Sequence, residues 1–308
     1  MRSRTPPFTA SAQKFKQVAL KYPRLIGRLF ATLRPGPPNV VVVLGARSGS
    51  SALAGTLALL GLQLPQNLMP ANRGNIKGHF EPQDLADLHD EILASAGSTW
   101  DDHREFPRQW FVSPAAQMAA AKICAVYRDD YPLAATAVLK EPRMCRLLPL
   151  WHRVFATLAL KPAFCFIDRH PMEVATSLHK RDGSSIEHGL LYYIRNHLDA
   201  EYDTRKMPRV FVNYDDLLAG WRQPVDKIGN HLKVRFSLSA EQITAVSDFL
   251  EDGLRHDRLL APVSPDDDIT QMALAVHAAF TILSKNPADQ GTRIDLDHLR
   301  NSFNRRFI

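Results

Sequence analysis

The sequence predicts an α/β protein: a doubly wound, mostly parallel sheet with flanking helices, a P-loop-like phosphate-binding loop, a helical N-terminal extension and C-terminal helices. Two observations support this fold class. Short apolar runs alternate with longer helical patterns, and a glycine-containing loop directly follows the first run. Ligands of such sheets bind outside the carboxyl ends of the strands, so each strand end is a candidate site.

The first predicted strand, Val40–Leu44, is a continuous β-branched run of the kind that is buried on both faces of a parallel sheet. Residues 137–139, 164–167 and 210–213 are the other predicted strands. Helical patterns separate the strands, and Pro171 stands where a first helical residue is expected. The predicted helices cover residues 52–60, 83–96, 114–128, 144–158, 171–180, 187–201 and 269–284.

Residues 1–36 are predicted to form a basic helical extension, and residues 37–308 a single α/β domain of the class described above. Pro23 is expected to break or kink the extension's helix, and a proline-rich stretch at 35–38 separates the two parts. No acidic residue precedes Glu81, whereas eleven basic residues do, which suggests a polyanionic partner. A solvated basic helix and a helix that docks to a membrane surface or a partner both stay open. Nucleic acid binding is not expected.

The composition excludes several classes of protein. With 308 residues, 45% of them hydrophobic, the chain can bury a large core and is not disordered over most of its length. Its longest weakly interrupted apolar stretch is too short to span a bilayer, which excludes a polytopic membrane protein. Three cysteines without metal-ligand spacing indicate neither a disulfide framework nor a zinc site. No secretory signal pattern is evident, so we expect a cytoplasmic protein.

The loop after the first strand, residues 45–51, is a candidate anion site. It joins a strand to a helix, so several backbone N–H groups and the helix N-terminus point into one concavity. Arg47 adds a full positive charge, and three serines add hydroxyl donors. The loop is not a Walker A sequence, because no Gly-Lys-Ser or Gly-Lys-Thr closes it.

Two further strand ends carry charged residues. Lys140, Glu141 and Arg143 leave the second strand at the ligand edge of the predicted sheet. Asp168 and Arg169 end the third strand, and the guanidinium fork of Arg169 suits phosphate oxygens. An acidic residue at the end of an apolar strand is also typical of a magnesium-binding Walker B motif.

At these strand ends the chain resembles the sulfotransferases that use 3′-phosphoadenosine 5′-phosphosulfate (PAPS). The family's phosphosulfate loop, Lys/Arg-Ser-Gly-Thr-Ser/Thr, is similar to residues 47–51, with Ser50 in place of the usual threonine. The family also has an arginine followed by proline two residues later and serine eight residues later, which Arg169, Pro171 and Ser177 match. The resemblance covers roughly residues 38–259 and implies that Arg169 and Ser177 bind the 3′-phosphate.

Smaller matches resemble the bacterial-type branch of the family. Residues 78–81, 97–102 and 140–143 are similar to segments of that branch, although Glu141 replaces the usual aspartate. Residues 212–217 resemble a Tyr-Glu-Asp-Leu segment, and residues 254–256 resemble a C-terminal Leu-Arg-His/Arg pattern. The resemblance implies that Arg255 replaces the family's Arg-Lys-Gly 3′-phosphate loop, which this chain lacks.

The resemblance implies a metal-independent site for PAPS and its product, 3′,5′-adenosine bisphosphate. Arg47 and Lys140 are then expected to stabilise the departing 5′-phosphate and the transferring group. A general base must take the proton of the acceptor hydroxyl or amine; Glu81 is the predicted base and His79 the second choice. The predicted donor-binding residues are Gly45, Ala46, Arg47, Ser48, Gly49, Ser50, Ser51, Arg169, Ser177 and Arg255.

Two other functions stay open from the sequence alone. A P-loop kinase or nucleotide hydrolase would use Mg-ATP with Asp168 as a metal ligand, and a non-catalytic module would bind nucleotide without turnover. The acceptor is expected to be a small molecule, a glycan or a peptide, with Trp100 and Phe106 as candidates to line its pocket. Residues 269–284 are interpreted as an amphipathic lid helix or the contact of a homodimer.

Overall fold

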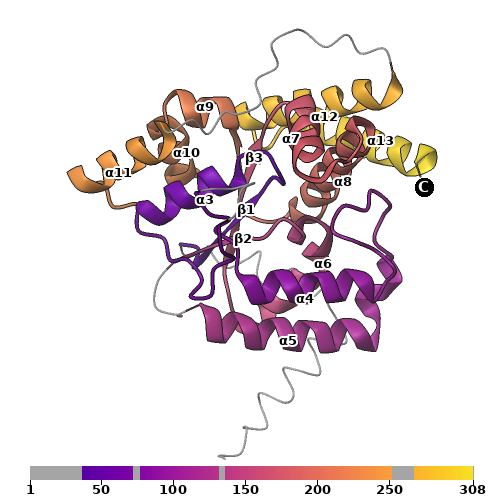
Figure 1. The fold of residues 1–308 in the computed structure, drawn as a ribbon, viewed down its shortest axis with the longest axis horizontal. Coiled ribbons are helices and arrows are strands. Elements are labelled where there is room, and N and C mark those ends of the chain that lie inside the picture. Colours follow the sequence, from indigo (N-terminus) through magenta and orange to yellow (C-terminus); the bar gives the residue numbers. More distant parts are fainter. Residues whose placement is uncertain (1–36, 72–76, 132–135, 252–266, 308) are drawn as a thin grey trace, which may run out of the picture. The chain divides into compact units, whose positions relative to one another are not determined.

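Four parallel strands lie at the centre of the protein in the spatial order β2–β1–β3–β4 (Figure 1). The computed structural model describes residues 37–71, 77–131, 136–251 and 267–307. The strands are β1 (Val40–Leu44), β2 (Ala137–Lys140), β3 (Pro162–Asp168) and β4 (Arg209–Asn213). Val43 pairs with Lys140 on one side and with Cys165 on the other, so the carboxyl ends of these strands meet at one edge of the sheet.

Helices follow and separate the strands, as the alternating pattern predicts. Pro114 and Pro171 each begin a helix, where a missing N–H has no consequence. In chain order the helices are α3 (Ser50–Leu59), α4 (Gln83–Ala94), the 3₁₀ helix η1 (Arg108–Val112), α5 (Pro114–Asp130), α6 (Met144–Leu158), α7 (Pro171–Asp182), α8 (Ile186–Thr204), α9 (Tyr214–Ala219), α10 (Arg222–Leu232), α11 (Ala240–Glu251), α12 (Asp268–Lys285) and α13 (Gln290–Arg306).

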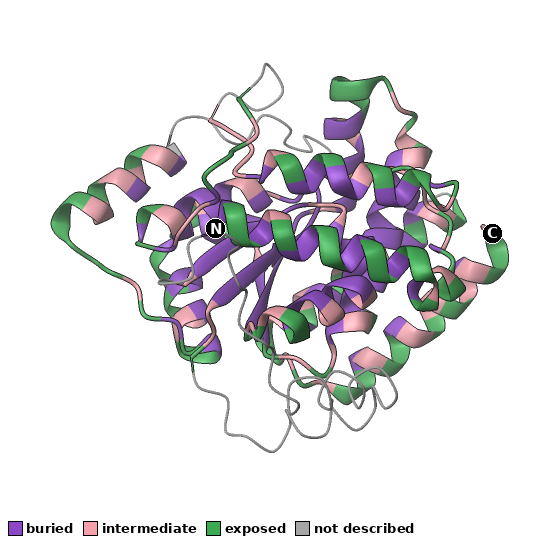
Figure 2. Ribbon diagram, turned by 90° about the horizontal axis from the view of Figure 1, so that it is seen from below, coloured by how far each residue is buried: buried purple, intermediate pink, exposed green. Residues whose placement is uncertain are grey.

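Both faces of the sheet are covered, which confirms the predicted doubly wound α/β class. Successive strand side chains point to opposite faces. Val40, Val42 and Leu44 belong to one buried cluster, which also holds residues of α4 to α8, α12 and α13. Val41 and Val43 belong to a second cluster, with residues of α3, α9, α10 and α11. In Figure 2 the strands are buried while the outward faces of the helices are exposed.

The order of the strands creates a switch point between β1 and β3. From β1 the chain continues to β2 on one side, and it then returns past β1 to form β3 and β4 on the other side. Loops that leave neighbouring strands in opposite directions open a crevice at the carboxyl edge, where ligands of this fold class bind. The loop after β1 and the β3–α7 connection leave neighbouring strands at that edge, and the region between them is named the crevice.

The four predicted strands and seven predicted helices are confirmed, with ends that differ by a few residues. Helices α9, α10, α11 and α13 are additions that the periodicity did not reveal. Among the described residues, no helix combines the length and the apolar composition that crossing a membrane requires. The predicted extension over residues 1–36 and the predicted ligand Arg255 lie outside the described residues, so both stay predictions.

Two glycines allow the loop after β1 to lie against its neighbours. Gly45 has φ +126°, and a Cβ atom there would lie 2.1 Å from the carbonyl oxygen of Ile167 in β3. Gly49 has φ +95°, and a Cβ atom there would lie 2.1 Å from the ring of Tyr214. Both positions require glycine for two reasons: the backbone conformation is left-handed, and neighbouring atoms fill the space that a Cβ atom would occupy. The loop is thereby held against β3 and the start of α9.

We expect Gly45→Ala to lower the free energy of unfolding by about 2–5 kcal/mol, the sum of left-handed backbone strain and overpacking against Ile167. Equilibrium urea denaturation measures this change. Gly97→Ala is the matched control, because Gly97 also has a positive φ (+69°) but nothing lies within 4 Å of the added Cβ. The control should lose only about 1–2 kcal/mol. Equal losses in the two variants would show that the approach of the loop to β3 does not constrain the fold.

Candidate active site

The loop after β1 ends at the N-terminus of α3, which is open to an anion. Gly49 is the N-cap residue, no side chain caps the helix, and its first turn holds no acidic residue. The N–H groups of the first turn and the positive end of the helix dipole therefore have no compensating group of their own. Ser48 and Ser50 are buried beside this helix end, and Arg47 has φ +58°, a backbone conformation that is rare for a residue with a side chain.

Arg47 bridges the loop to helix α7. Its Nη2 donates to Ser177 Oγ at 2.6 Å, and its Nε is buried without a hydrogen-bond partner in the described part of the chain. No carboxylate of the described residues forms an ion pair with Arg47. Burial lowers the pKa of Arg47, and the nearby positive charge of Arg181 lowers it further. A buried cation with an unused donor and only a neutral partner is suited to an anionic ligand.

Arg169 lies beside the same crevice at the start of α7. Its Nε donates to Glu173 Oε2 at 2.7 Å, and its guanidinium lies over the ring of Tyr214 at 5.1 Å from the centroid. Tyr214 is also the residue against which Gly49 packs. The carboxylate and the ring fix the plane of the guanidinium, so Arg169 is preoriented rather than mobile.

The predicted catalytic residues meet on the other side of the loop. The ammonium group of Lys140 forms a buried ion pair with Glu81. Lys140 Nζ also donates to the carbonyl oxygen of His79 at 3.1 Å and to Ser51 Oγ at 3.3 Å. Lys140 therefore joins the end of β2, the start of α3 and the segment at residues 77–82. The main chain of that segment is held as well, because the Met69 N–H donates to the Glu81 carbonyl at 2.8 Å.

His79 is placed to exchange a proton. Its Nδ1 lies 4.0 Å from Glu81 Oε1, and its buried Nε2 has no hydrogen-bond partner within the described residues. Burial lowers the pKa of His79, and the charges of Lys140 and Arg47 act in the same direction. The lowered pKa favours the uncharged imidazole, which has a ring nitrogen that can accept a proton. The next residue, Phe80, has φ +55°, so the segment that carries both base candidates holds backbone strain.

Glu141, which the sequence leaves without a role, is part of the scaffold. Its side chain is inaccessible to solvent and pairs with His89 and with Arg143, whose Nη1 lies 2.7 Å from Oε1. Trp151 Nε1 donates to His89 Nε2 at 3.0 Å, so that nitrogen accepts and Nδ1 carries the proton shared with Glu141. Burial alone would raise the pKa of Glu141, but His89 and Arg143 hold it below its usual value. Glu141 therefore anchors the start of α6 beneath Lys140.

Asp168, the candidate Walker B residue, is occupied by protein partners. Tyr193 Oη donates to its Oδ1 at 2.7 Å, and His277 Nδ1 lies 2.6 Å from its Oδ2. Burial would by itself raise the pKa of Asp168, but the neighbouring His197 and His277 lower it to about 2. The carboxylate thus joins β3 to α8 and α12, and its oxygens face protein donors. Among the described residues, no group of three or more His, Cys, Asp or Glu side chains is arranged to hold a metal ion.

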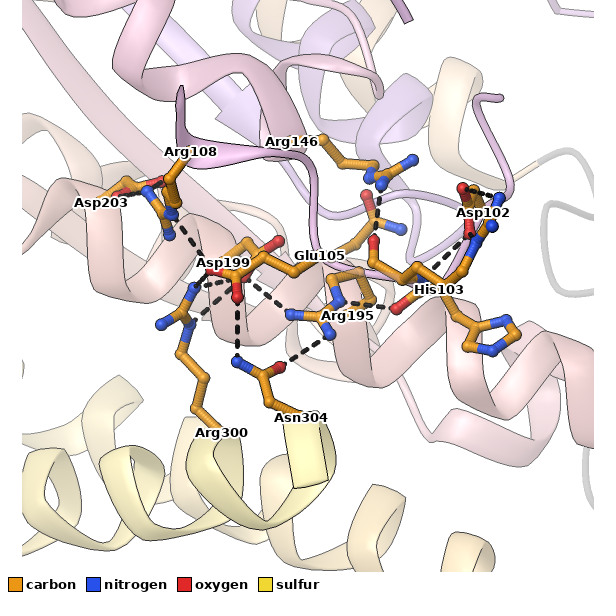
Figure 3. Close-up of polar contacts among 12 residues, drawn as sticks. Asp102, His103, Glu105, Arg108, Arg146, Arg195, Asp199, Asp203, Arg300 and Asn304 are labelled. Atoms are coloured by element: carbon orange, nitrogen blue, oxygen red, sulfur yellow. Dashed lines mark hydrogen bonds and ion pairs between the residues drawn. The ribbon is translucent and has the colours of Figure 1, made fainter. Parts of the chain in front are cut away.

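A polar network fixes the loop at residues 98–105 (Figure 3). Arg146 donates to the carbonyl oxygens of Thr99 and Arg104, both at 2.7 Å, and Arg195 donates to that of His103, also at 2.7 Å. Arg195 is fully buried and continues to Asp199 and to Asn304 of the C-terminal helix. Guanidinium groups from α6 and α8 thus satisfy three main-chain acceptors of this loop, which holds it in one conformation.

The two aromatic candidates for the acceptor pocket differ in position. The prediction for Phe106 is wrong: it is 2% exposed and packs against Trp110 and Phe111 in the core. Trp100 is half-buried, and the guanidinium of Arg181 lies over its ring at 4.8 Å.

The structure brings most of the predicted site residues to the switch point. Arg47 meets Ser177, and Lys140 meets both Glu81 and the main chain of His79. Gly45, Ala46, Ser48, Gly49, Ser50 and Ser51 form the loop and the helix start between these pairs. Sequence reasoning missed Glu173 and Arg181. Each lies four residues from Ser177, so all three share one face of α7, and this spacing could have identified them.

Comparisons with known proteins show distant similarity to solved sulfotransferase structures. No family model matches the chain, and no curated protein matches it. A sulfotransferase domain from the curacin biosynthetic pathway is 14% identical at a TM-score of 0.43, and the alignment covers 78% of this chain and 97% of that chain. A sulfotransferase domain from the olefin synthase of Synechococcus PCC 7002 is 17% identical at a TM-score of 0.43, over 80% and 96% of the two chains. The sulfotransferase STF1 from Mycobacterium tuberculosis is 17% identical at a TM-score of 0.37, over 75% of each chain.

We expect Arg195→Met to lower the free energy of unfolding by about 2–4 kcal/mol, because the His103 carbonyl loses its Arg195 donor and buried Asp199 keeps only Arg300. Equilibrium denaturation measures this loss. Arg104→Met is the control in the same loop: the Arg104 side chain is 61% exposed, and its partner Asp102 keeps the Ser98 hydroxyl as a donor, so a loss of only about 1 kcal/mol is expected. If both variants were equally stable, the buried network would not be holding the loop.

Proposed function

We propose that the protein is a sulfotransferase that moves a sulfuryl group from PAPS to a hydroxyl or amine acceptor. The observation that carries the proposal is the bond between Arg47 and Ser177. It joins the loop that matches the family's phosphosulfate motif to the helix that matches its 3′-phosphate motif. Two motifs 130 residues apart thus contribute to one crevice.

The residues present fit the anionic donor. Arg47 has a buried Nε that lacks a hydrogen-bond partner among the described residues, and no side chain caps the N-terminus of α3. Arg47 and the N–H groups of the loop are suited to the 5′-phosphosulfate, and Arg169 with Ser177 to the 3′-phosphate. Arg255 remains a candidate for the same phosphate from outside the described residues.

The proposed reaction is an in-line displacement at sulfur. The sulfur–oxygen bond to the 5′-phosphate breaks as the bond to the acceptor oxygen or nitrogen forms, and the acceptor proton passes to a base on the protein. Lys140 and Arg47 would stabilise the negative charge that develops on the leaving phosphate. We propose Glu81 as the base, because its buried carboxylate adjoins Lys140 at the crevice. His79 is the second candidate, because its neutral ring has an unpartnered nitrogen.

A magnesium-dependent kinase or nucleotide hydrolase has less support. That function needs an acidic metal ligand at the end of β3, where Asp168 instead accepts from Tyr193 and pairs with His277. The loop also lacks the Walker A lysine, and its basic residue, Arg47, is directed to Ser177. The comparison of nucleotide ligands below separates the two functions.

We expect 3′,5′-adenosine bisphosphate to stabilise the full chain without magnesium, whereas Mg-ATP should have a smaller effect. A ligand present at about 100 times its Kd adds about 2.7 kcal/mol of stability, which raises the Tm by a few degrees in a thermal-shift measurement. Ser177→Ala and Arg169→Ala should each weaken this response, since each removes a donor proposed for the 3′-phosphate.

The matched control for these variants is Arg128→Gln, an exposed arginine of α5 that is distant in sequence from every proposed ligand. It should respond to the bisphosphate as the unmodified chain does. Stabilisation by Mg-ATP alone would contradict the sulfotransferase proposal and favour a nucleotide hydrolase. Stabilisation by the bisphosphate without turnover of PAPS in any acceptor screen would favour a non-catalytic binding module.

We expect Glu81→Gln to lower kcat by about 10²–10⁴-fold while the affinity for the bisphosphate changes little. Glutamine keeps an oxygen that can accept from Lys140, so the variant removes the base and retains the contact. The measurement is the release of bisphosphate from PAPS with an acceptor found in a screen of phenols, glycans and peptides. His79→Gln is tested beside it: a large loss in this variant, with near-normal kcat in Glu81→Gln, would make His79 the base.

A further inference from the structure

One face of α7 carries a ladder of polar side chains along the crevice. Glu173, Ser177 and Arg181 are spaced four residues apart, so they lie on the same face of the helix. Glu173 binds Arg169 at one end, and Ser177 binds Arg47 in the middle. Arg181 therefore lies one helical turn, about 5–6 Å, beyond the contact of Arg47 and away from Arg169. The ladder continues past the residues proposed for the donor.

Arg181 packs against an aromatic side chain and is still partly accessible to solvent. Its guanidinium lies 4.8 Å from the centre of the Trp100 ring, and Trp100 in turn packs edge-on against Tyr192 at 5.6 Å. Asp182 accepts from Arg181 Nε at 2.6 Å and from Nη2 at 2.5 Å, which leaves Nη1 to bond a ligand, and the Arg181 side chain keeps 31% of its surface exposed. Trp100 belongs to the loop that buried Arg146 and Arg195 fix in place. The loop that carries Trp100 therefore fixes the position of the Arg181 guanidinium.

The charge of Arg181 acts on the residues where transfer is proposed to occur. After burial, Arg181 is the largest influence that lowers the pKa of Arg47, and it also contributes to the lowered pKa of His79. The donor already has Arg47, Lys140 and Arg169 as cations. Arg181 lies one helical turn from the contact of Arg47, on the side away from Arg169, next to the Trp100 ring, and its charge reaches His79.

We propose that Arg181 and Trp100 form an acceptor subsite, and that the acceptor is a ring-bearing alcohol or phenol that carries an anionic group: a carboxylate, a phosphate or a sulfate. The proposal rests on the proposed function and names its substrate class. The ring lies along Trp100 and the anion binds the Arg181 guanidinium, which places the acceptor hydroxyl toward Glu81 and His79. Charge-assisted bonds to a guanidinium are strong enough to decide between acceptors of equal size.

The experiment measures acceptor binding to the full chain saturated with 3′,5′-adenosine bisphosphate, by calorimetry. Four phenols differ only in the para group: 4-hydroxybenzoate, 4-hydroxyphenyl phosphate, 4-hydroxybenzenesulfonate and the neutral 4-hydroxybenzamide. We expect at least one anion to bind about ten-fold more tightly than the amide, which is the effect of one charge-assisted bond. The anion that binds best identifies the group that the subsite accepts.

Variants assign the preference to Arg181. Arg181→Gln should abolish the difference between anion and amide and leave the affinity for the bisphosphate unchanged, whereas Arg181→Lys should retain part of the difference. Arg128→Gln, the exposed control, should behave as the unmodified chain. Equal binding of all four phenols, binding of none, or a loss of bisphosphate affinity in Arg181→Gln would overturn the proposal. Failure of the unmodified chain to bind the bisphosphate would instead overturn the proposed function, and the subsite with it.

Discussion

The pairing of β1 with β3 is the constraint on which the candidate site depends. Gly45 leaves β1 in a left-handed conformation with its Cα against the Ile167 carbonyl, so no side chain can separate the loop from β3. This approach sets the distance between the loop and α7, and only then can Arg47 reach Ser177. The pairing of β1 with β2 places the end of β2 on the other side of β1, where Lys140 reaches the segment of His79 and Glu81. Both halves of the crevice therefore follow from the order of the strands.

The elements that the sequence predicts well are those whose signal is local. Residues Val40–Leu44 are all apolar because both faces of β1 are buried, and this apolar run is visible in the sequence itself. The candidate site was likewise predictable as far as strand ends and short motifs reach. The partners of Glu141 and Asp168 were not, because His89 and His277 lie 52 and 109 residues away. Nothing local distinguishes a Walker B aspartate from one that ties a strand to two helices.

The segment at residues 77–82 shows how strain and polar contacts are balanced at the site. Phe80 adopts a left-handed conformation that costs about 1 kcal/mol or more. The segment keeps this shape because the Lys140 ammonium binds the His79 carbonyl, and because the Phe80 ring packs edge-on against Phe249 of α11. Local propensity would relax the backbone, whereas the tertiary contacts hold it. The strained conformation is what directs His79 and Glu81 to one point.

The carboxylate partners of the basic side chains indicate which of them would attract the donor most strongly. Lys140 has Glu81 and Arg169 has Glu173 as a buried carboxylate partner, so each brings little net charge to an incoming anion. Arg47 is different, because among the described residues it bonds only to a neutral hydroxyl and keeps a buried donor unused. The uncompensated charge is thus concentrated beside the α3 N-terminus. In the proposed reaction negative charge develops on the leaving phosphate at that point. The attraction between Arg47 and this phosphate would therefore increase as the sulfur–oxygen bond breaks. An interaction that is stronger in the transition state than in the bound substrate lowers the activation barrier and does not only tighten binding.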